Sequence, residues 1–139
     1  PGTYGTLGYS LPAAIGAKLA CPKQTVLSIS GDGGFMFTVQ ELATARALNL
    51  DLIALVFNDN AFGAIRKYQD RMFGGRHIGS ALANPDFVKL GEAFGVHSKR
   101  VDADQLGDAV AQAHKAGGTW LIEVPFAPGG AAEMVPWMP

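Results

Sequence analysis

The sequence has few of the features that mark secreted and membrane proteins. Its 139 residues include a single cysteine, Cys21, so no disulfide can form within the chain, which excludes a disulfide-stapled secreted module. No apolar run approaches the roughly 18 residues of a membrane-spanning helix, and the longest, residues 52–57, has the length of a strand. Because the chain also lacks a basic segment followed by an apolar one of the kind that directs secretion, we expect a cytoplasmic protein.

Charge is scarce, and neither sign dominates. Eleven Lys and Arg residues stand against twelve Asp and Glu residues, which gives a net charge of −1. A protein that binds nucleic-acid phosphates or an anionic membrane needs a basic excess, so we expect neither partner. Charged residues make up 17% of the chain, against about 25% in a typical soluble domain. So few charges predict that part of the surface is covered by another domain or subunit, or lines a binding site.

The length of the chain corresponds to one domain with a sizeable core. We therefore expect residues 1–139 to form a single domain. Because the sequence begins with Pro1 rather than Met, this domain is expected to be a fragment of a longer, multidomain chain. The proline-rich tail, residues 125–139, is expected to be extended.

Helix and strand patterns alternate along the chain. Small and apolar residues at 11–19 predict a closely packed helix, and the β-rich segment 25–30 predicts a strand. The uninterrupted apolar run at residues 52–57 is typical of a strand covered on both faces. Shorter strands are predicted at residues 96–101 and 120–124. This alternation predicts an α/β fold in which a parallel sheet carries helices on both faces.

Several polar residues predict where helices begin. Thr38, followed three residues later by an acid, has the pattern of a capping box and predicts a helix from this point. Asn84, followed by Pro85, is predicted to be the N-cap of a later helix, and Asp102 that of the last one. The glycine- and arginine-containing segment 70–83 is predicted to be a surface loop.

Two acidic residues each follow a predicted strand. Asp32 comes just after the strand at 25–30, and Asp59 just after the strand at 52–57. Because ligands collect at the carboxyl ends of parallel strands, the two carboxylates are expected to share one crevice if the strands are neighbours. Carboxylates this close repel each other unless a proton or a cation lies between them. Mg²⁺ is the cation that typically combines one or two carboxylates with phosphate oxygens.

The residues after Asp32 are suited to a phosphate group. Gly33 and Gly34 are expected to leave their backbone N–H groups unobstructed, and the helix beginning near Thr38 is expected to direct its positive end toward the same place. Together with Asp59 on the next strand, these features predict a metal-bridged diphosphate site.

This arrangement resembles a known motif. Gly31, Asp32 and Gly33, followed one strand later by Asn58 and Asp59, are similar to the thiamine diphosphate motif, in which Gly-Asp-Gly precedes a paired Asn. The family's second Asn is Asp59 here, which adds a negative charge at the metal and is expected to preserve binding.

The resemblance covers nearly the whole chain. Residues 5–17 resemble the segment that precedes the motif in acetolactate synthase-like enzymes and decarboxylases, and the likeness continues through residues 84–87 and 121–125. The sequence is therefore identified as similar to the C-terminal pyrophosphate-binding domain of the thiamine-diphosphate-dependent enzyme superfamily. Within it, the acetolactate synthase large subunit is the type it resembles most.

The resemblance implies a set of cofactor-binding residues. Mg²⁺ would be bound by the side chains of Asp32 and Asp59 and by the backbone carbonyl of Ala61. Leu7 would be the apolar wedge beneath the cofactor, and the carbonyl of Gly5 would accept a hydrogen bond from the pyrimidine amino group. Four further residues would offer backbone contacts to the diphosphate: Gly33, Gly34, Gly63 and Ala64.

The resemblance also implies a substrate pocket on the helix that follows the metal-binding loop. Ile65 and Tyr68 are expected to line it, because this helix faces the substrate in the family. Tyr68 stands where acetohydroxyacid synthases usually carry Trp, and Ala64 replaces a larger residue, so the acceptor preference stays open.

The activity that the resemblance implies depends on thiamine diphosphate and Mg²⁺. It is the decarboxylation of a 2-oxo acid such as pyruvate, followed by ligation of the product to a second carbonyl compound. A non-ligating decarboxylase of the benzoylformate type is an alternative, and so is a cofactor-binding subunit with a structural or regulatory role. A Rossmann-type nucleotide-binding module is a further alternative, although residues 31–34 lack the Gly-x-Gly-x-x-Gly order.

The resemblance places the catalytic glutamate outside this chain. In the family it comes from a pyrimidine-binding domain, usually that of the partner subunit. None of the four glutamates of this chain matches its motif: Glu41, Glu92, Glu123 and Glu133. We therefore expect no catalytic residue and no activity in this chain alone. The active site is expected to form in a homodimer or homotetramer, with the pyrimidine-binding domain of the same or a partner subunit.

Overall fold

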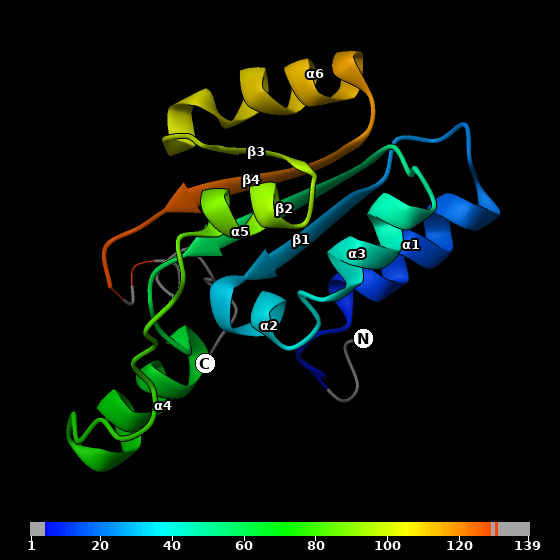
Figure 1. Ribbon diagram of the computed structural model, residues 1–139. Coiled ribbons are helices and arrows are strands. Elements are labelled where there is room, and N and C mark those ends of the chain that lie inside the picture. Colours follow the sequence, from blue (N-terminus) through cyan, green and yellow to red (C-terminus); the bar gives the residue numbers. More distant parts are fainter. Residues whose placement is uncertain (1–4, 129, 131–139) are drawn as a thin grey trace.

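A four-stranded parallel sheet forms the centre of the computed structural model, which describes residues 5–128 and residue 130 (Figure 1). The strand order is β1-β2-β4-β3. The strands are β1 (Leu27–Gly31), β2 (Leu52–Asn58), β4 (Thr119–Pro125) and β3 (His97–Arg100). Residues 129 and 131–139 lie outside the described residues, so the expectation of an extended tail concerns a segment that is mostly not described.

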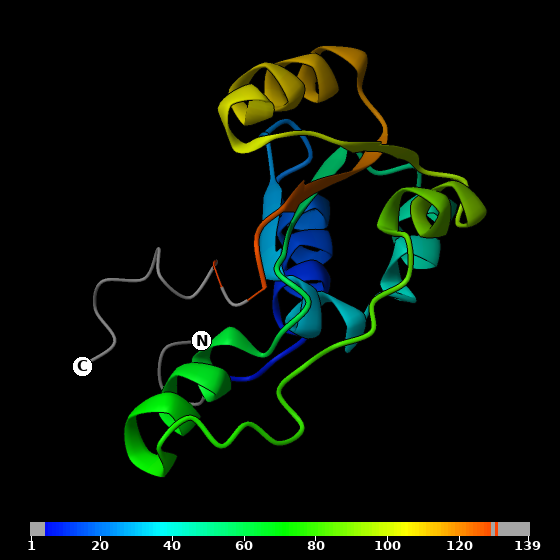
Figure 2. The ribbon, with the colours of Figure 1, turned by 90° about the vertical axis from the view of Figure 1, so that its left-hand side faces the viewer.

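Helices cover both faces of this sheet, as Figures 1 and 2 show together. Helices α1, α3 and α5 pack on one face, and α6 packs on the other. This arrangement confirms the predicted α/β fold. Among the described residues, no helix is long and apolar enough to cross a membrane. The helices are α1 (Ser10–Ala20), α2 (Asp32–Met36), α3 (Glu41–Ala47), α4 (Gly63–Phe73), α5 (Phe87–Ala93), the 3-10 turn η1 (Ala103–Gln105) and α6 (Leu106–Ala116).

Strand β2 is buried on both faces, as its uninterrupted apolar run predicts. Ala54 and Val56 point into the core beneath α1, α3 and α5, which also contains Phe87. Ile53 and Leu55 point into the core beneath α6. Each fully buried Val, Leu or Ile side chain stabilises the fold by about 1.5–3 kcal/mol, so β2 is held by packing on both of its faces.

The strand order follows from the handedness of the crossovers. Parallel strands are joined by right-handed connections, so the direction of each step decides which face its helix covers. From β1 to β2 and onward to β3 the chain steps in one direction, and α3 and α5 pack on the same face. From β3 it steps back to insert β4 beside β2, and α6 packs on the opposite face.

The predicted capping box at Thr38 is wrong. Helix α3 begins at Glu41, with Gln40 as an N-cap whose side chain makes no capping hydrogen bond. The Thr38 hydroxyl instead donates to the carbonyl oxygen of Gly8 over 2.9 Å. The helix that directly follows β1 is α2, which begins at Asp32 itself, so the helix end nearest this carboxylate is that of α2.

The predicted N-cap at Asn84 is also wrong. Asp86 caps α5, because its carboxylate accepts from the backbone N–H groups of Val88 and Lys89 at 3.1 and 3.4 Å. The Asn84 side chain instead donates to oxygens at the ends of β1 and β2, three residues before α5 begins. The predicted N-cap at Asp102 is confirmed, and the structure adds a capping box with Gln105.

The close packing of α5 on the sheet predicts a steric requirement at Gly91. A Cβ atom there would collide with the Ser98 hydroxyl and lie 3.0 Å from Leu121 Cδ2. We expect Gly91→Ala to lower the free energy of unfolding by about 1–3 kcal/mol through overpacking. A Cβ atom added at Gly107 in α6 would meet no atom within 4 Å, so Gly107 is the matched control. Gly107→Ala is expected to leave the free energy of unfolding unchanged or to raise it by up to about 1 kcal/mol. Equal urea midpoints for the two variants would contradict the packing described here.

Candidate functional site

The two acidic residues lie at the same edge of the sheet. Asp32 is the first residue after β1, and Asp59 is the first residue after β2. The two strands are hydrogen-bonded neighbours, with Gly31 opposite Phe57, so their carboxyl ends lie side by side. Both acidic residues are only 2% exposed. The neighbouring placement of the strands confirms the condition on which the shared crevice depended.

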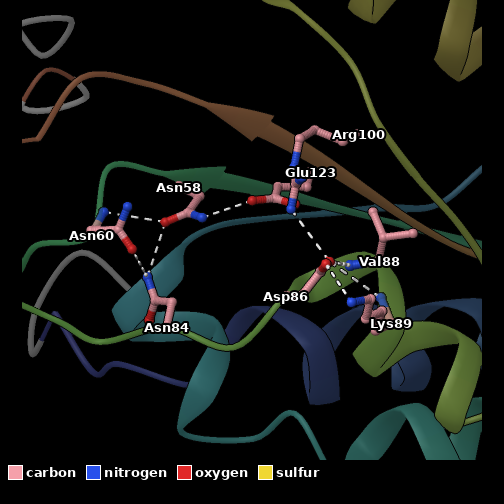
Figure 3. Close-up of polar contacts among 8 residues, drawn as sticks. All are labelled: Asn58, Asn60, Asn84, Asp86, Val88, Lys89, Arg100 and Glu123. Carbon is pink, nitrogen blue, oxygen red and sulfur yellow. Dashed lines mark hydrogen bonds and ion pairs between the residues drawn. The ribbon is translucent and has the colours of Figure 1, made fainter.

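A third chain segment brings an amide group to this edge. The Asn84 Nδ2 atom lies 2.5 Å from Asp32 Oδ2. It also lies 3.0 Å from Asn58 Oδ1 and 3.3 Å from Asn60 Oδ1 (Figure 3). One amide nitrogen, which carries two hydrogens, therefore faces three oxygen atoms from the ends of two strands. The result is a cluster of side-chain oxygens gathered at one point.

The loop after β2 is held in place by backbone hydrogen bonds. Ala61 is buried and forms an isolated antiparallel bridge with Ala81. The two hydrogen bonds beside it run from Phe62 N to Ser80 O at 2.9 Å and from Leu82 N to Asn60 O at 2.8 Å. These bonds engage the neighbours of Ala61 rather than its own carbonyl. The segment that leads to Asn84 therefore clamps the loop that follows Asp59.

The two glycines after Asp32 have different surroundings. The backbone N–H of Gly33 donates to Asp32 Oδ1 over 2.9 Å, and a Cβ atom at Gly33 would collide with the ring of Phe62. At Gly34 the nearest atom to such a Cβ would be Leu7 Cδ2, at an ordinary contact distance of 3.7 Å. Gly33 is thus required for close packing of the two loops, whereas Gly34 faces a more open space.

That space is a cavity of about 560 Å³ along the outer side of β1 and α1. Leu7 and Gly34 both line it, whereas Asp32 and Asp59 do not. The loop that carries Leu7 is anchored by the hydrogen bond from Thr38 to Gly8. Gly5 is exposed, with a φ of 56°, and its predicted hydrogen bond to the cofactor stays a prediction.

Helix α4 starts close to the acidic edge and extends away from the sheet (Figure 1). It begins at Gly63, and none of its residues is buried. Ala64 is exposed, and the side chains predicted to line a substrate pocket are only half covered, with Ile65 47% and Tyr68 49% exposed. The N–H groups of the first turn of a helix have no partner within it, so Gly63 and Ala64 offer free donors on the side of Asp59.

An ion pair between a buried carboxylate and a half-exposed arginine adjoins the cluster, and we did not predict it. Asn58 Nδ2 donates to Glu123 Oε1 over 2.7 Å, and Arg100 Nε donates to Glu123 Oε2 over 2.8 Å (Figure 3). Glu123 is 2% exposed. Arg100 also reaches Asp86, the N-cap of α5, at 3.3 Å. A hydrogen-bonded row therefore crosses the carboxyl edge of the sheet.

Sequence signals for the missed residues exist but are weak. Glu123 is the one charged residue in the strand Thr119–Pro125, which is otherwise mostly apolar. Asn58 and Asn60 flank Asp59, and Asn84 precedes a proline. No spacing rule connects Asn84 or Glu123 to Asp32, because only the folded sheet brings them together.

The donor atoms at this edge suit a hard cation. Mg²⁺ prefers carboxylate, carbonyl and amide oxygens, and the edge offers the carboxylates of Asp32 and Asp59 together with the Ala61 carbonyl. Within residues 5–128 and 130, no group of three or more His, Cys, Asp and Glu side chains could hold a metal. The donor atoms at this edge are thus oxygens of the kind that a magnesium ion uses when it takes its remaining ligands from a bound phosphate.

Comparison with known proteins gives consistent matches. The family model described as thiamine pyrophosphate enzyme, C-terminal TPP binding domain, matches residues 1–124. The acetolactate synthase large subunit of Buchnera aphidicola subsp. Acyrthosiphon pisum (strain APS) is 47% identical over 95 residues, or 68% of this chain and 17% of that protein. The mitochondrial acetolactate synthase catalytic subunit of Aspergillus candidus is 36% identical over 139 residues, or 93% of this chain and 20% of that protein.

The fold has a solved counterpart as well. The crystal structure of benzoylformate decarboxylase from Polynucleobacter necessarius superposes with a TM-score of 0.79 and 29% sequence identity, over 90% of this chain and 24% of that one. The chain thus spans between 17% and 24% of the length of these three proteins.

The contact between Gly33 and Phe62 predicts that substitutions at these two residues have non-additive effects on the free energy of unfolding. We expect Gly33→Ala to lower the free energy of unfolding by about 1–3 kcal/mol, because the added methyl group collides with the ring. Gly34→Ala, which meets only Leu7 at 3.7 Å, is the matched control and is expected to change it by less than about 0.5 kcal/mol. In a Phe62→Ala background the cost of Gly33→Ala should shrink, since residues in contact are not additive. Strict additivity in this double-mutant cycle would refute the contact.

Proposed function

The chain belongs to the thiamine pyrophosphate enzymes as a C-terminal TPP binding domain, and from this premise we propose that it binds the diphosphate of thiamine diphosphate through Mg²⁺ at the carboxyl edge of its sheet. One observation carries the proposal. Asp32 and Asp59, both buried, leave two adjacent parallel strands at the same edge, where amide oxygens also converge. Two such carboxylates repel each other unless a cation compensates their charge.

The residues divide into three groups by role. Asp32 and Asp59 would ligate Mg²⁺ through their carboxylates, and Ala61 through its backbone carbonyl. The diphosphate would accept hydrogen bonds from backbone N–H groups of four residues, and Leu7 would support the cofactor from below. When bound, thiamine diphosphate supplies the stabilisation of negative charge at the reacting carbon, and the protein orients it. The four N–H donors are those of Gly33, whose bond to Asp32 Oδ1 in this structure would be exchanged for the diphosphate, and of Gly34, Gly63 and Ala64.

The proposed reaction is the decarboxylation of a 2-oxo acid such as pyruvate, followed by ligation to a second carbonyl compound. The likeness to acetolactate synthase large subunits supports it. A non-ligating decarboxylation is the second candidate, because the superposed solved structure is that of a benzoylformate decarboxylase. Ile65 and Tyr68 would contact the substrate in either case. Family membership argues against the Rossmann-type module that the sequence left open.

We further propose that the active site is completed by a pyrimidine-binding domain of the same or a partner subunit in a homodimer or homotetramer. Residues 1–139 would then be one domain of a longer chain. The surface of α4 supports this, because Met72 and Phe73 are exposed beside Ile65 and Tyr68 on a helix that buries none of its residues. Such an apolar surface is typical of an interface. The cytoplasm stays our expectation for the compartment, although one relative is mitochondrial.

The cation-dependent site is tested by calorimetric titration of the chain with thiamine diphosphate. We expect binding only when Mg²⁺ is present, and we expect Asp32→Ala to weaken it by more than about 100-fold, since even partners outside the metal's own ligands cost about 10- to 100-fold. Asp59→Asn is the matched comparison. It keeps an oxygen ligand and is expected to stay within about tenfold of the native affinity. Tight binding without Mg²⁺, or in the folded Asp32→Ala variant, would contradict the proposed site.

The division of the active site predicts where activity appears. The 139-residue chain, saturated with thiamine diphosphate and Mg²⁺, is expected to release no CO₂ from pyruvate, because the glutamate that activates the cofactor belongs to another domain. The full-length protein is expected to release CO₂ under the same conditions. Turnover by the 139-residue chain alone would overturn the proposed division, and binding without turnover in the full-length protein would favour a structural or regulatory subunit.

A further inference from the structure

We propose that Glu123 is a positioning residue of the cation site, which acts by fixing the orientation of the Asn58 side-chain amide. This inference rests on the proposed function, because it concerns the affinity of the same edge for a divalent cation. Glu123 does not reach Asp32 directly. Its effect passes through Asn58 and Asn84, which link β4 to the residue that follows β1.

Glu123 is itself held from two sides. Its Oε2 atom accepts from Arg100 Nε at 2.8 Å, and its Oε1 atom accepts from Asn58 Nδ2 at 2.7 Å. The residue lies on β4 opposite Val56 of β2 and Arg100 of β3. Because both oxygens are occupied and the side chain is buried, the carboxylate has one position available to it.

This carboxylate decides which end of the Asn58 amide faces the cluster. The carboxylate of Glu123 has no hydrogen to donate. The Asn58 side-chain group that contacts it must therefore be the NH₂ group, which donates. The Asn58 oxygen then faces the other way, where it accepts from Asn60 N at 3.2 Å and from Asn84 Nδ2 at 3.0 Å. With the amide reversed, an NH₂ group would face two donors, and an oxygen would face the carboxylate of Glu123.

The orientation of Asn58 is passed on to Asp32. Asn84 donates to both Asn58 Oδ1 and Asp32 Oδ2, so the position of one acceptor restrains the other. The second oxygen of Asp32 is held by the N–H of Gly33. The carboxylate proposed to bind Mg²⁺ is thus oriented by a row that begins at Arg100, at the opposite edge of the sheet. Figure 3 shows this row from Arg100 to Asn84.

The substitution Glu123→Gln tests this role because it exchanges the donor and the acceptor in the hydrogen bond between positions 123 and 58. The new amide accepts from Arg100 with its oxygen and therefore presents NH₂ to Asn58. Asn58 must then turn its oxygen toward position 123 and its NH₂ group toward Asn60 and Asn84. We expect the dissociation constant of Mn²⁺, measured by electron paramagnetic resonance in the presence of thiamine diphosphate, to rise by about 10- to 100-fold.

A second substitution restores an oxygen acceptor at position 58 toward Asn60 and Asn84. In the double variant Glu123→Gln and Asn58→Asp, the carboxylate introduced at position 58 accepts from the glutamine and still presents an oxygen to Asn60 and Asn84. The pair keeps one carboxylate and one amide, in exchanged places. We expect its Mn²⁺ dissociation constant to return to within about threefold of the native value, a recovery expected only for partners that act as a unit. Lys99→Ala, which removes a surface contact with Gln112, is the control and is expected to bind as the native chain does.

The outcomes separate this inference from the proposed function. If the native full-length protein binds no Mn²⁺ with thiamine diphosphate, the proposed function fails. If the native protein binds and Glu123→Gln binds equally well, Glu123 has no positioning role. If the single variant fails to bind or to fold while the double variant binds, the inference is supported. If the double variant also fails to bind or to fold, restoring the orientation at position 58 does not restore the site, and the inference is overturned.

Discussion

The structure depends on the need to satisfy buried polar groups where four parallel strands end together. A buried carboxylate without partners is strongly unfavourable, so each acidic group at this edge requires donors. Those donors come from neighbouring strands: Arg100 at the end of β3 and Asn58 at the end of β2 both bond to Glu123 on β4. Asn84 then joins Asn58 to Asp32, which follows β1. The apolar core holds the strands in register, and this register brings the polar groups together.

The elements that carry the site explain why one part of it is held rigidly and another part is exposed. The oxygens that would receive Mg²⁺ are set by the sheet and by the clamped loop around Ala61, and a binding constellation built on such elements is more precise than one on free loops. In contrast, α4 carries the predicted substrate-facing residues, Ile65 and Tyr68, and buries none of its own. The chain therefore combines a buried, well-ordered polar edge with an exposed helix beside it.

The relation to larger enzymes is consistent with this division. The chain is a C-terminal TPP binding domain and matches acetolactate synthase large subunits over a limited part of their length. A domain of this kind contributes binding and orientation, while the reacting carbon belongs to the cofactor. The scarcity of charge in the sequence, 17% of residues, agrees with a surface of which part is meant to be covered.

The sequence by itself determined the alternation of strands and helices, the burial of β2 on both faces and the placement of Asp32 and Asp59 after consecutive strands, because these depend on local hydrophobic patterns. It did not determine the capping of α3 or α5, where Thr38 and Asn84 have the side chains of N-caps but bond to distant groups instead. Only the tertiary structure decided that β4 lies between β2 and β3, and with it the meeting of Glu123 with Asn58 and Arg100. The physical reason is that such hydrogen bonds join residues far apart in the sequence, so no local pattern encodes them until the sheet has assembled.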